Sequence, residues 1–156
     1  MKTHNILSIE EFKSNIESKS RLLGIDPGKK NVGLAICDEN KKVATPLKII
    51  KKVKFEIFLT ELKKIVDENN IKGIIIGNPI NMDGSQGESS QSALDLAKNL
   101  SKFIDIPISL WDERLSSEAS FKFAKELGQN TSNIVSKLDK NAAAFILQGA
   151  IDYITN

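Results

Sequence analysis

The segment Gly73-Ile74-Ile75-Ile76-Gly77 has no polar side chain at any position. A strand with one face in water alternates apolar and polar residues, whereas a strand covered by helices on both faces shows no such alternation. A short, uniformly apolar segment is therefore typical of a central strand in a parallel sheet. It predicts an α/β protein with this strand in the middle of the sheet.

Amphipathic helices flank this strand on both sides. Residues 55–70 and residues 93–104 carry apolar side chains three and four positions apart, which is the spacing of one helix face. A second apolar strand is predicted at 106–111. The order helix, strand, helix, strand indicates a parallel unit with helical crossovers. The polar segment 78–88 then forms a loop at the carboxyl end of the central strand.

Apolar runs at 21–26, 32–37 and 43–50 precede the first of these helices, separated by the turn formers Pro27-Gly28 and Asp38-Glu39-Asn40. Short turns between apolar runs predict an antiparallel meander. The expected fold class is therefore α/β, with a mixed five-stranded sheet of three antiparallel strands followed by two parallel strands. Helices are expected on both of its faces.

The two ends of the chain also carry helical patterns. In residues 5–20 apolar side chains recur three and four apart, and Ser8 and Glu11 have the spacing of a capping box. We assign residues 1–20 to an N-terminal helical extension and residues 21–156 to a single domain.

Two helices are predicted toward the C-terminus, at 117–127 and from 138 onward, with a polar connection at 129–132. The apolar face expected for the last helix consists of Leu138, Ala142, Phe145, Ile146, Gly149 and Tyr153.

The composition is that of an ordinary globular protein, with 40% hydrophobic and 27% charged residues in 156 positions. No apolar run approaches the ~20 residues of a membrane span, and the first residues lack the apolar core of a signal peptide. We therefore expect a cytoplasmic protein without a membrane partner. The single cysteine, Cys37, excludes an intrachain disulfide, and its apolar neighbours predict a buried thiol.

Positive charge is concentrated in one part of the chain. Residues 29–54 contain eight lysines and only two acidic residues, although the net charge of the whole chain is +2. The cluster is either a surface that faces a polyanion or an ordinary solvated face.

Acidic residues fall where the predicted sheet brings them to one edge. Asp26 ends the first strand, Asp112 and Glu113 follow the last strand, and Asp139 lies in the first turn of the last helix. The carboxyl ends of parallel strands border one crevice, and carboxylates gathered there repel one another unless a cation neutralises them. Hard oxygen ligands suit Mg²⁺ or Mn²⁺, and two such ions about 4 Å apart activate water for attack on a phosphodiester.

Each acidic residue also has a plain structural interpretation. Asp26-Pro27-Gly28 favours a turn, Asp112 and Glu113 suit a solvated strand end, and a helix N-terminus favours Asp139. Strand alternation puts Asp112 and Glu113 on opposite faces without showing which face borders the crevice.

Four segments together carry a more specific signal. They are 23–35 (LGIDPGKKNVGLA), 76–84 (IGNPINMDG), 111–117 (WDERLSS) and 139–148 (DKNAAAFILQ). In order and spacing they resemble the motifs of the YqgF family, the RuvX-like proteins of the ribonuclease H-like superfamily. Its members are described as candidate Holliday junction resolvases and as nucleases that mature the precursor of 16S rRNA. The resemblance implies a ribonuclease H-like fold with a divalent-metal nuclease site.

Carried over by position, the resemblance implies that Asp26, Glu113 and Asp139 are the catalytic metal ligands, with Asp112 or Asp83 as a fourth acidic group. Asp26 would bridge two Mg²⁺ or Mn²⁺ ions. The further residues expected to contact the substrate are Lys30, Asn78, Asp83, Arg114, Ser116, Lys137 and Lys140. The lysines at 30, 41, 42, 51, 52 and 54 would steer the polyanion.

The chain departs from the family pattern at two places. Asn31 stands where the family usually has a basic residue, which weakens one expected phosphate contact. Ser116 and Ser117 replace threonines and keep the hydroxyl groups. Neither change removes an expected metal ligand.

The expected function is a metal-dependent endonuclease that hydrolyses phosphodiester bonds of structured nucleic acid. Its expected role is 5′-end processing of pre-16S rRNA in ribosome biogenesis, Holliday junction resolution, or both. The alternative is a non-catalytic nucleic-acid or ribosome-binding module on the same fold, since a fold alone does not guarantee activity. The expected partners are pre-rRNA or branched DNA and ribosomal precursor particles, and the chain is expected as a monomer or a homodimer.

Overall fold

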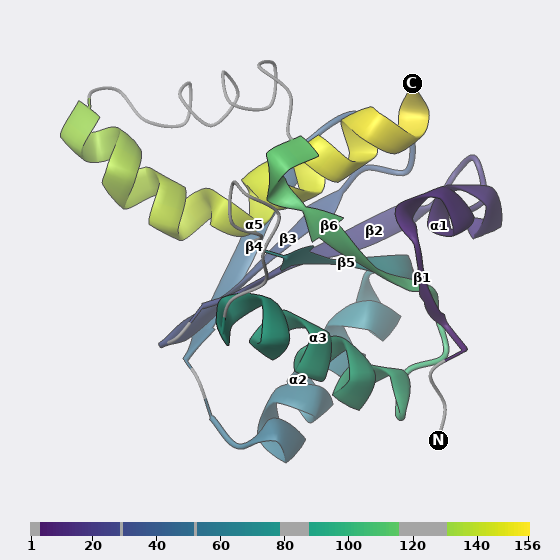
Figure 1. Cartoon of the computed structure of the whole chain (residues 1–156), viewed down its shortest axis with the longest axis horizontal. Helices are drawn as coiled ribbons and strands as arrows, with labels where there is room; N and C mark the ends of the chain where they lie inside the picture. Colours follow the sequence, from purple (N-terminus) through teal and green to yellow (C-terminus); the bar gives the residue numbers. More distant parts are fainter. Residues whose placement is uncertain (1–3, 29, 52, 79–87, 116–130) are drawn as a thin grey trace.

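The computed structural model describes residues 4–28, 30–51, 53–78, 88–115 and 131–156, and for residues 88–90, 114 and 131–140 it describes the backbone alone. Within these ranges the strands form one sheet in the order β1-β6-β5-β2-β3-β4 (Figure 1). The strands are β1 (Ile6–Leu7), β2 (Arg21–Pro27), β3 (Asn31–Cys37), β4 (Ala44–Lys51), β5 (Ile71–Asn78) and β6 (Ile108–Asp112). The first four strands in the sheet order run parallel, β3 pairs antiparallel with β2, and β4 pairs antiparallel with β3.

Helices cover both faces of this sheet. The described helices are α1 (Ile9–Asn15), α2 (Phe55–Glu68), α3 (Glu88–Ser101), the short 3-10 helix η1 (Glu113–Leu115) and α5 (Thr131–Thr155). Figure 1 shows α2 and α3 on one face and α1 and α5 on the other, and each pair closes its own hydrophobic core. The predicted central strand is β5, in which Ile74, Ile75 and Ile76 are fully buried. The predicted mixed α/β fold is therefore confirmed.

The sheet has one strand more than the sequence pattern predicts. The pattern of residues 5–20 predicts a short amphipathic helix and no strand, but Ile6 and Leu7 pair with β6 before α1 begins at Ile9. The predicted capping box between Ser8 and Glu11 is present and defines that helix start.

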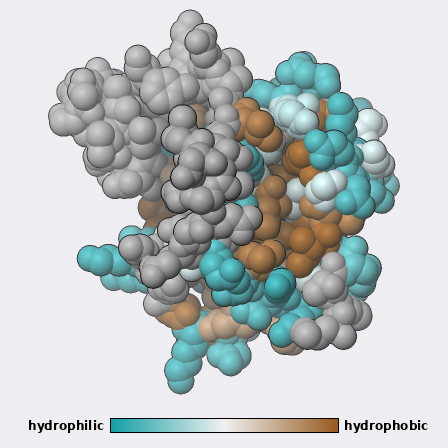
Figure 2. Space-filling view, viewed as in Figure 1, coloured by the Kyte–Doolittle hydropathy of each residue, from teal (hydrophilic) through white to brown (hydrophobic). Residues whose placement is uncertain are grey.

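Hydrogen bonds of Asn5 explain why a strand precedes α1. This side chain is only 5% exposed, and its Nδ2 donates to the carbonyl oxygens of Ile104 at 2.7 Å and Ile106 at 2.9 Å. The backbone N–H of Ile108 donates to the carbonyl oxygen of Asn5 at 2.8 Å. The bonds of one buried amide thus attach the N-terminal segment beside β6, where Figure 2 shows hydrophobic residues gathered on the visible face.

The last helix begins earlier than its sequence predicts. The polar residues at 129–132 are typical of a connection, yet α5 starts at Thr131, eight residues before Asp139. The expectation that Asp139 lies in the first helical turn is therefore wrong, and the helix dipole does not account for an acidic residue there. Ile134 and Leu138 continue the helical spacing of apolar residues toward the N-terminus. This spacing indicates a helix although most of the neighbouring residues are polar. The helix predicted at 117–127 lies outside the described residues.

The buried face of α5 matches the predicted one only in part, since Ile146 and Gly149 are buried as expected. Tyr153 is exposed, whereas the buried residues of the described side chains include Ala143, Ala144, Leu147 and Ala150. Small alanines fill the interface because the helix lies close to the sheet.

Cys37 is buried as predicted, and burial raises the pKa of its thiol.

Glycines let α5 approach the sheet closely. A Cβ added to Gly24 of β2 would lie 2.7 Å from Cβ of Leu147, and one added to Gly77 of β5 would overlap Ile146. Real side chains do not reach such distances, so any larger residue would push α5 outward.

Among the described residues no helix is long and apolar enough to cross a membrane.

Replacement of Gly24 by alanine is expected to lower the free energy of unfolding by about 1–3 kcal/mol, because Leu147 and the carbonyl of Ala143 cannot both move away. Urea unfolding followed by circular dichroism measures the change. Gly33→Ala is the matched control, since its Cβ would meet neighbours at 3.5 and 3.7 Å, an ordinary contact distance. Equal losses in the two variants would contradict the close approach of α5.

Candidate active site

Asp26 lies on the face of the sheet that α5 covers. Along β2, Leu23 and Ile25 belong to the core under α2 and α3, whereas Gly24 faces α5. Alternation therefore turns Asp26 toward α5. Gly33, its partner across β2 and β3, confirms this direction, because an added Cβ would lie 3.7 Å from Cβ of Asp26 and 3.5 Å from Cβ of Ala143.

The second acidic position is at the end of β6. Asp112 is the last residue of this strand and pairs with Asn78, the last residue of β5. Alternation places Asp112 on the face of Ile108, which lies in the core under α2 and α3. Glu113 begins η1, which contacts α5. The chain thus carries Glu113 toward the face on which Asp26 lies.

Electrostatics connect these carboxyl groups. Burial raises the pKa of Glu113, and the negative charges of Asp26 and Asp112 raise it further. Desolvation and like charges both disfavour the ionised form, so this cluster stores repulsion that a cation would relieve. Asp26 and Glu113 come from β2 and the end of β6, with β5 between these strands.

Asn78 contributes a polar atom at the same edge. Its Oδ1 is buried and has no hydrogen-bond partner among the described residues. A buried carbonyl oxygen without a partner is costly, and such groups are retained where a ligand or solvent satisfies them. This observation suits the expected role of Asn78 in substrate binding.

The other expected site residues are placed less fully. Asp139, Lys137 and Lys140 lie in α5 and Arg114 in η1, where the backbone alone is described. Asp83 and Ser116 lie outside the described residues. No group of three or more His, Cys, Asp or Glu side chains able to hold a metal occurs within the described part of the chain. Asp26 and Glu113 supply hard oxygen donors of the kind that Mg²⁺ and Mn²⁺ prefer, so the donor chemistry fits.

The lysines of the basic segment divide into two groups. Those with exposed side chains among the lysines expected to steer a polyanion are Lys30, Lys42, Lys51 and Lys54. Lys51 pairs with Asn31 beside the β2–β3 turn, which places it at the Asp26 end of the sheet, whereas Lys42 precedes β4 at the opposite end.

Lys41 does not belong to the exposed group. It is 7% exposed, and its Nζ donates to the carbonyl oxygens of Glu17 at 3.0 Å and Ser18 at 2.6 Å. The expectation that Lys41 steers a polyanion is therefore wrong. Its positive φ of 54° in the turn after β3 accompanies this inward placement, which sequence spacing does not reveal. Lys52 lies outside the described residues.

Comparison with known proteins identifies the family. Residues 20–153 match the family described as "RuvX: Holliday junction resolvase". The chain belongs to the RuvX family. The resemblance of its four motifs is thereby confirmed, and the match covers the sheet from β2 to β6 and nearly all of α5.

RuvX-family relatives match over almost their whole length. A protein of Pelagibacter ubique named "Putative pre-16S rRNA nuclease" is 51% identical over 151 residues, which cover 97% of this chain and 100% of the relative. One of the same name from Ruegeria pomeroyi is 41% identical over 149 residues, covering 96% and 97%. Among solved structures, "T. thermophilus RuvC in complex with Holliday junction substrate" aligns with a TM-score of 0.50 at 14% identity, covering 87% of this chain and 96% of that one. This likeness shows the ribonuclease H-like fold.

Sequence reasoning missed one feature beside these residues. Leu115 of η1 and Tyr153 of α5 line a cleft, although the pattern assigns Tyr153 to the buried helix face. A tyrosine near the end of an amphipathic helix is equally consistent with a partly exposed position, and its polar hydroxyl was the available signal.

The variant Glu113→Gln is expected to raise the melting temperature by a few degrees at neutral pH in EDTA. Because the folded state raises the pKa of Glu113, ionisation of this carboxyl costs folding free energy. Without metal the chain therefore loses stability as pH rises from the ordinary glutamate range through the raised pKa, and the gain from glutamine vanishes in acid. Differential scanning calorimetry measures it, with the exposed Glu39→Gln as control. A gain that is the same at all pH values would refute the electrostatic cause.

Proposed function

We propose that this chain is a divalent-metal-dependent endonuclease that processes the 5′ end of pre-16S rRNA. The observation that carries the proposal is that Asp26, Asp112 and Glu113 gather at the carboxyl ends of parallel strands, where burial and the two aspartates raise the pKa of Glu113. Such a cluster is costly without a cation and useful with one. Family membership and the names of the RuvX relatives supply the substrate class.

The course of α5 supports Asp139 as a third ligand. Leu147 packs on Gly24, whereas Ala143, one turn earlier, lies beside both Gly24 and Gly33. The helix therefore runs antiparallel to β2, and its earlier turns extend past the level of Asp26. Asp139 lies four residues, or about 6 Å, before Ala143 on the same helix face. That position suits a carboxylate that joins Asp26 and Glu113.

The residues of the site divide the chemistry between them. When bound, Mg²⁺ or Mn²⁺ supplies the positive charge that activates water for in-line attack and stabilises the leaving oxygen. Asp26 and Glu113, with Asp139, would hold the ions and fix their position on rigid strand ends. Asn78, on the Asp112 side of the strand ends, offers its amide oxygen as an acceptor to a sugar hydroxyl of the substrate. Lys30, Lys51 and Lys54 attract the flanking phosphates, so binding weakens as salt rises.

The variant Asp26→Asn is expected to reduce cleavage at least about a hundredfold while nucleic-acid binding remains, since even changes behind the ligands of a metal site cost 10–100-fold. The measurement is cleavage of a labelled pre-16S rRNA leader and of a four-way DNA junction in Mg²⁺, in Mn²⁺ and in EDTA. The junction is the second candidate substrate because the family description names it.

Each outcome of that experiment has a distinct meaning. Leader cleavage by the wild type alone supports the proposal, whereas cleavage of the junction alone replaces the substrate. Salt-sensitive binding without any cleavage favours a non-catalytic nucleic-acid or ribosome-binding module. Equal cleavage by wild type and Asp26→Asn indicates a contaminating nuclease.

Glu113→Gln is expected to abolish cleavage, whereas Asp112→Asn leaves a rate within about tenfold of the wild type. The physical reason is the sheet face: Glu113 follows the strand toward α5 and Asp26, whereas Asp112 lies on the side of Ile108. Single-turnover cleavage rates at saturating Mg²⁺ decide between the two carboxyls. A larger loss in Asp112→Asn would assign the ligand to Asp112 instead.

A further inference from the structure

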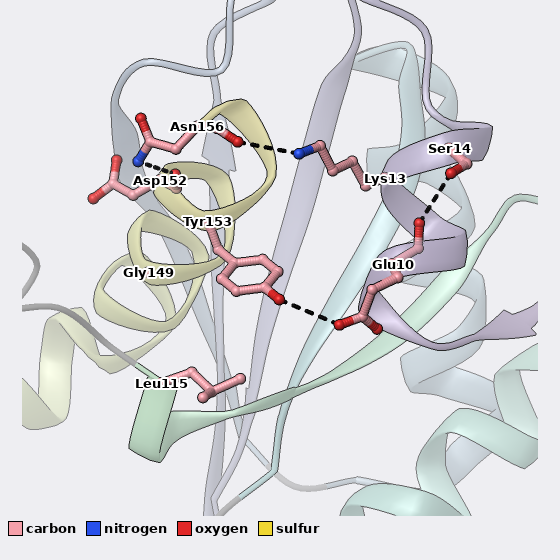
Figure 3. Close-up of a pocket in the computed structure, with 8 residues that line it drawn as sticks. All are labelled: Glu10, Lys13, Ser14, Leu115, Gly149, Asp152, Tyr153 and Asn156. Atoms are coloured by element: carbon pink, nitrogen blue, oxygen red, sulfur yellow. Dashed lines mark hydrogen bonds between the residues drawn. The ribbon is translucent and has the colours of Figure 1, made fainter.

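A cleft separates α1 from the C-terminal end of α5 and ends at η1. Its volume is about 610 Å³, within the range of ligand-binding clefts. The lining includes Glu10, Lys13, Leu115, Asp152, Tyr153 and Asn156. Figure 3 shows the tyrosine ring of α5 between the two helices, with the Leu115 side chain of η1 on the same side of the cleft.

The tyrosine ring is held in a fixed orientation. It packs against the buried Trp111 in an edge-type arrangement, with the ring centroids 5.6 Å apart and an angle of 62° between the ring planes. Its hydroxyl donates to Oε1 of Glu10 at 3.2 Å, and this bond together with the carboxylate charge raises the pKa of Tyr153. Tyr153 is nevertheless 41% exposed and Leu115 is 50% exposed. A rigid aromatic surface that remains open to solvent loses little entropy when a flat ligand stacks on it.

Charges in the cleft select the kind of group that fits. Glu10 and Asp152 contribute two carboxylates, whereas Lys13 is the one cation among the described side chains of the lining, and its Nζ donates to the carbonyl oxygen of Asn156 at 3.1 Å. A phosphate would meet net negative charge here. A neutral nucleobase would instead stack on the ring and donate its N–H groups to carboxylate oxygens.

The cleft continues the proposed active site. Leu115 lies two residues after Glu113 in the same short helix. Along α5, Tyr153 follows Ala143, which adjoins Asp26, by ten residues or about 15 Å. That span corresponds to roughly four stacked nucleotides at 3.4 Å each and to fewer in an extended strand.

We propose that this cleft binds one unpaired nucleobase of the substrate strand, a few nucleotides from the cleaved bond, by stacking on Tyr153 and Leu115. The assignment rests on the proposed function in taking nucleic acid as the ligand. It adds that the substrate carries a single-stranded segment on one side of the cleavage site, and that this segment positions the strand.

A base-deletion scan tests the proposal through binding alone. The probe is a fluorescent RNA that spans the 5′ end of 16S rRNA and its leader, with an abasic nucleotide placed at each successive position. Affinity is measured in the Asp26→Asn background, so that cleavage does not interfere. One abasic position, or two adjacent ones, should weaken binding about 5- to 150-fold, the range of base–aromatic stacking. In Tyr153→Ala the same positions should have no further effect.

Matched variants separate stacking from folding. Tyr153→Phe keeps the ring and should keep the position-dependent loss, and Phe103→Ala removes an exposed aromatic ring outside this cleft and should leave the scan unchanged. Because each variant is compared with itself on intact and abasic RNA, a general loss of stability cancels.

An abasic profile that is flat, or that Tyr153→Ala leaves intact, overturns the inference. Uniformly weaker binding in Tyr153→Ala without position dependence also overturns it, because the effect of the tyrosine would then not depend on a base. The cleavage assay is a separate test. Cleavage together with a flat abasic profile supports the proposed nuclease function and overturns the base site. A position-dependent profile without cleavage supports the base site and contradicts the nuclease function.

Discussion

The close contact between α5 and the sheet is the constraint on which the proposed site depends. Gly24 and Gly77 remove the side chains that would hold the helix away, and alanines on α5 complete the contact. The same contact fixes the distance of the helix from β2 and the direction in which it runs across this strand. It therefore determines which turn of α5 lies beside Asp26. A ligand on a helix and a ligand on a strand can share a metal only when such an interface is rigid.

Carboxylate repulsion is the cost of this arrangement. Burial and the charges of Asp26 and Asp112 disfavour the ionised form of Glu113, which is the form that binds a cation. The cluster is tolerable because the surrounding strands are anchored by a fully buried isoleucine core. Stability therefore lies in β5 and its neighbours, and the strand ends can carry groups that oppose folding until a ligand arrives.

The sequence is sufficient where a local pattern has one physical solution. Three consecutive isoleucines between glycines suit only a strand buried on both faces, and the spacing of Ser8 and Glu11 marks the start of α1. It is insufficient where a distant contact decides: β1 depends on bonds from Asn5 to carbonyls about a hundred residues away, and Lys41 turns inward to carbonyls near residue 17. The four acidic positions could be named from motifs, but the face on which Glu113 lies required the sheet.

The distribution of charge explains how an acidic site can receive a polyanion. Lys30, Lys51 and Lys54 lie at the β3–β4 side of Asp26, whereas the cleft with Glu10 and Asp152 lies on the β6 side, where Tyr153 packs on Trp111. A strand that crosses the site therefore meets attraction for its phosphates on one side and repulsion on the other. Repulsion of phosphates beside an exposed aromatic ring turns the backbone outward and the base inward.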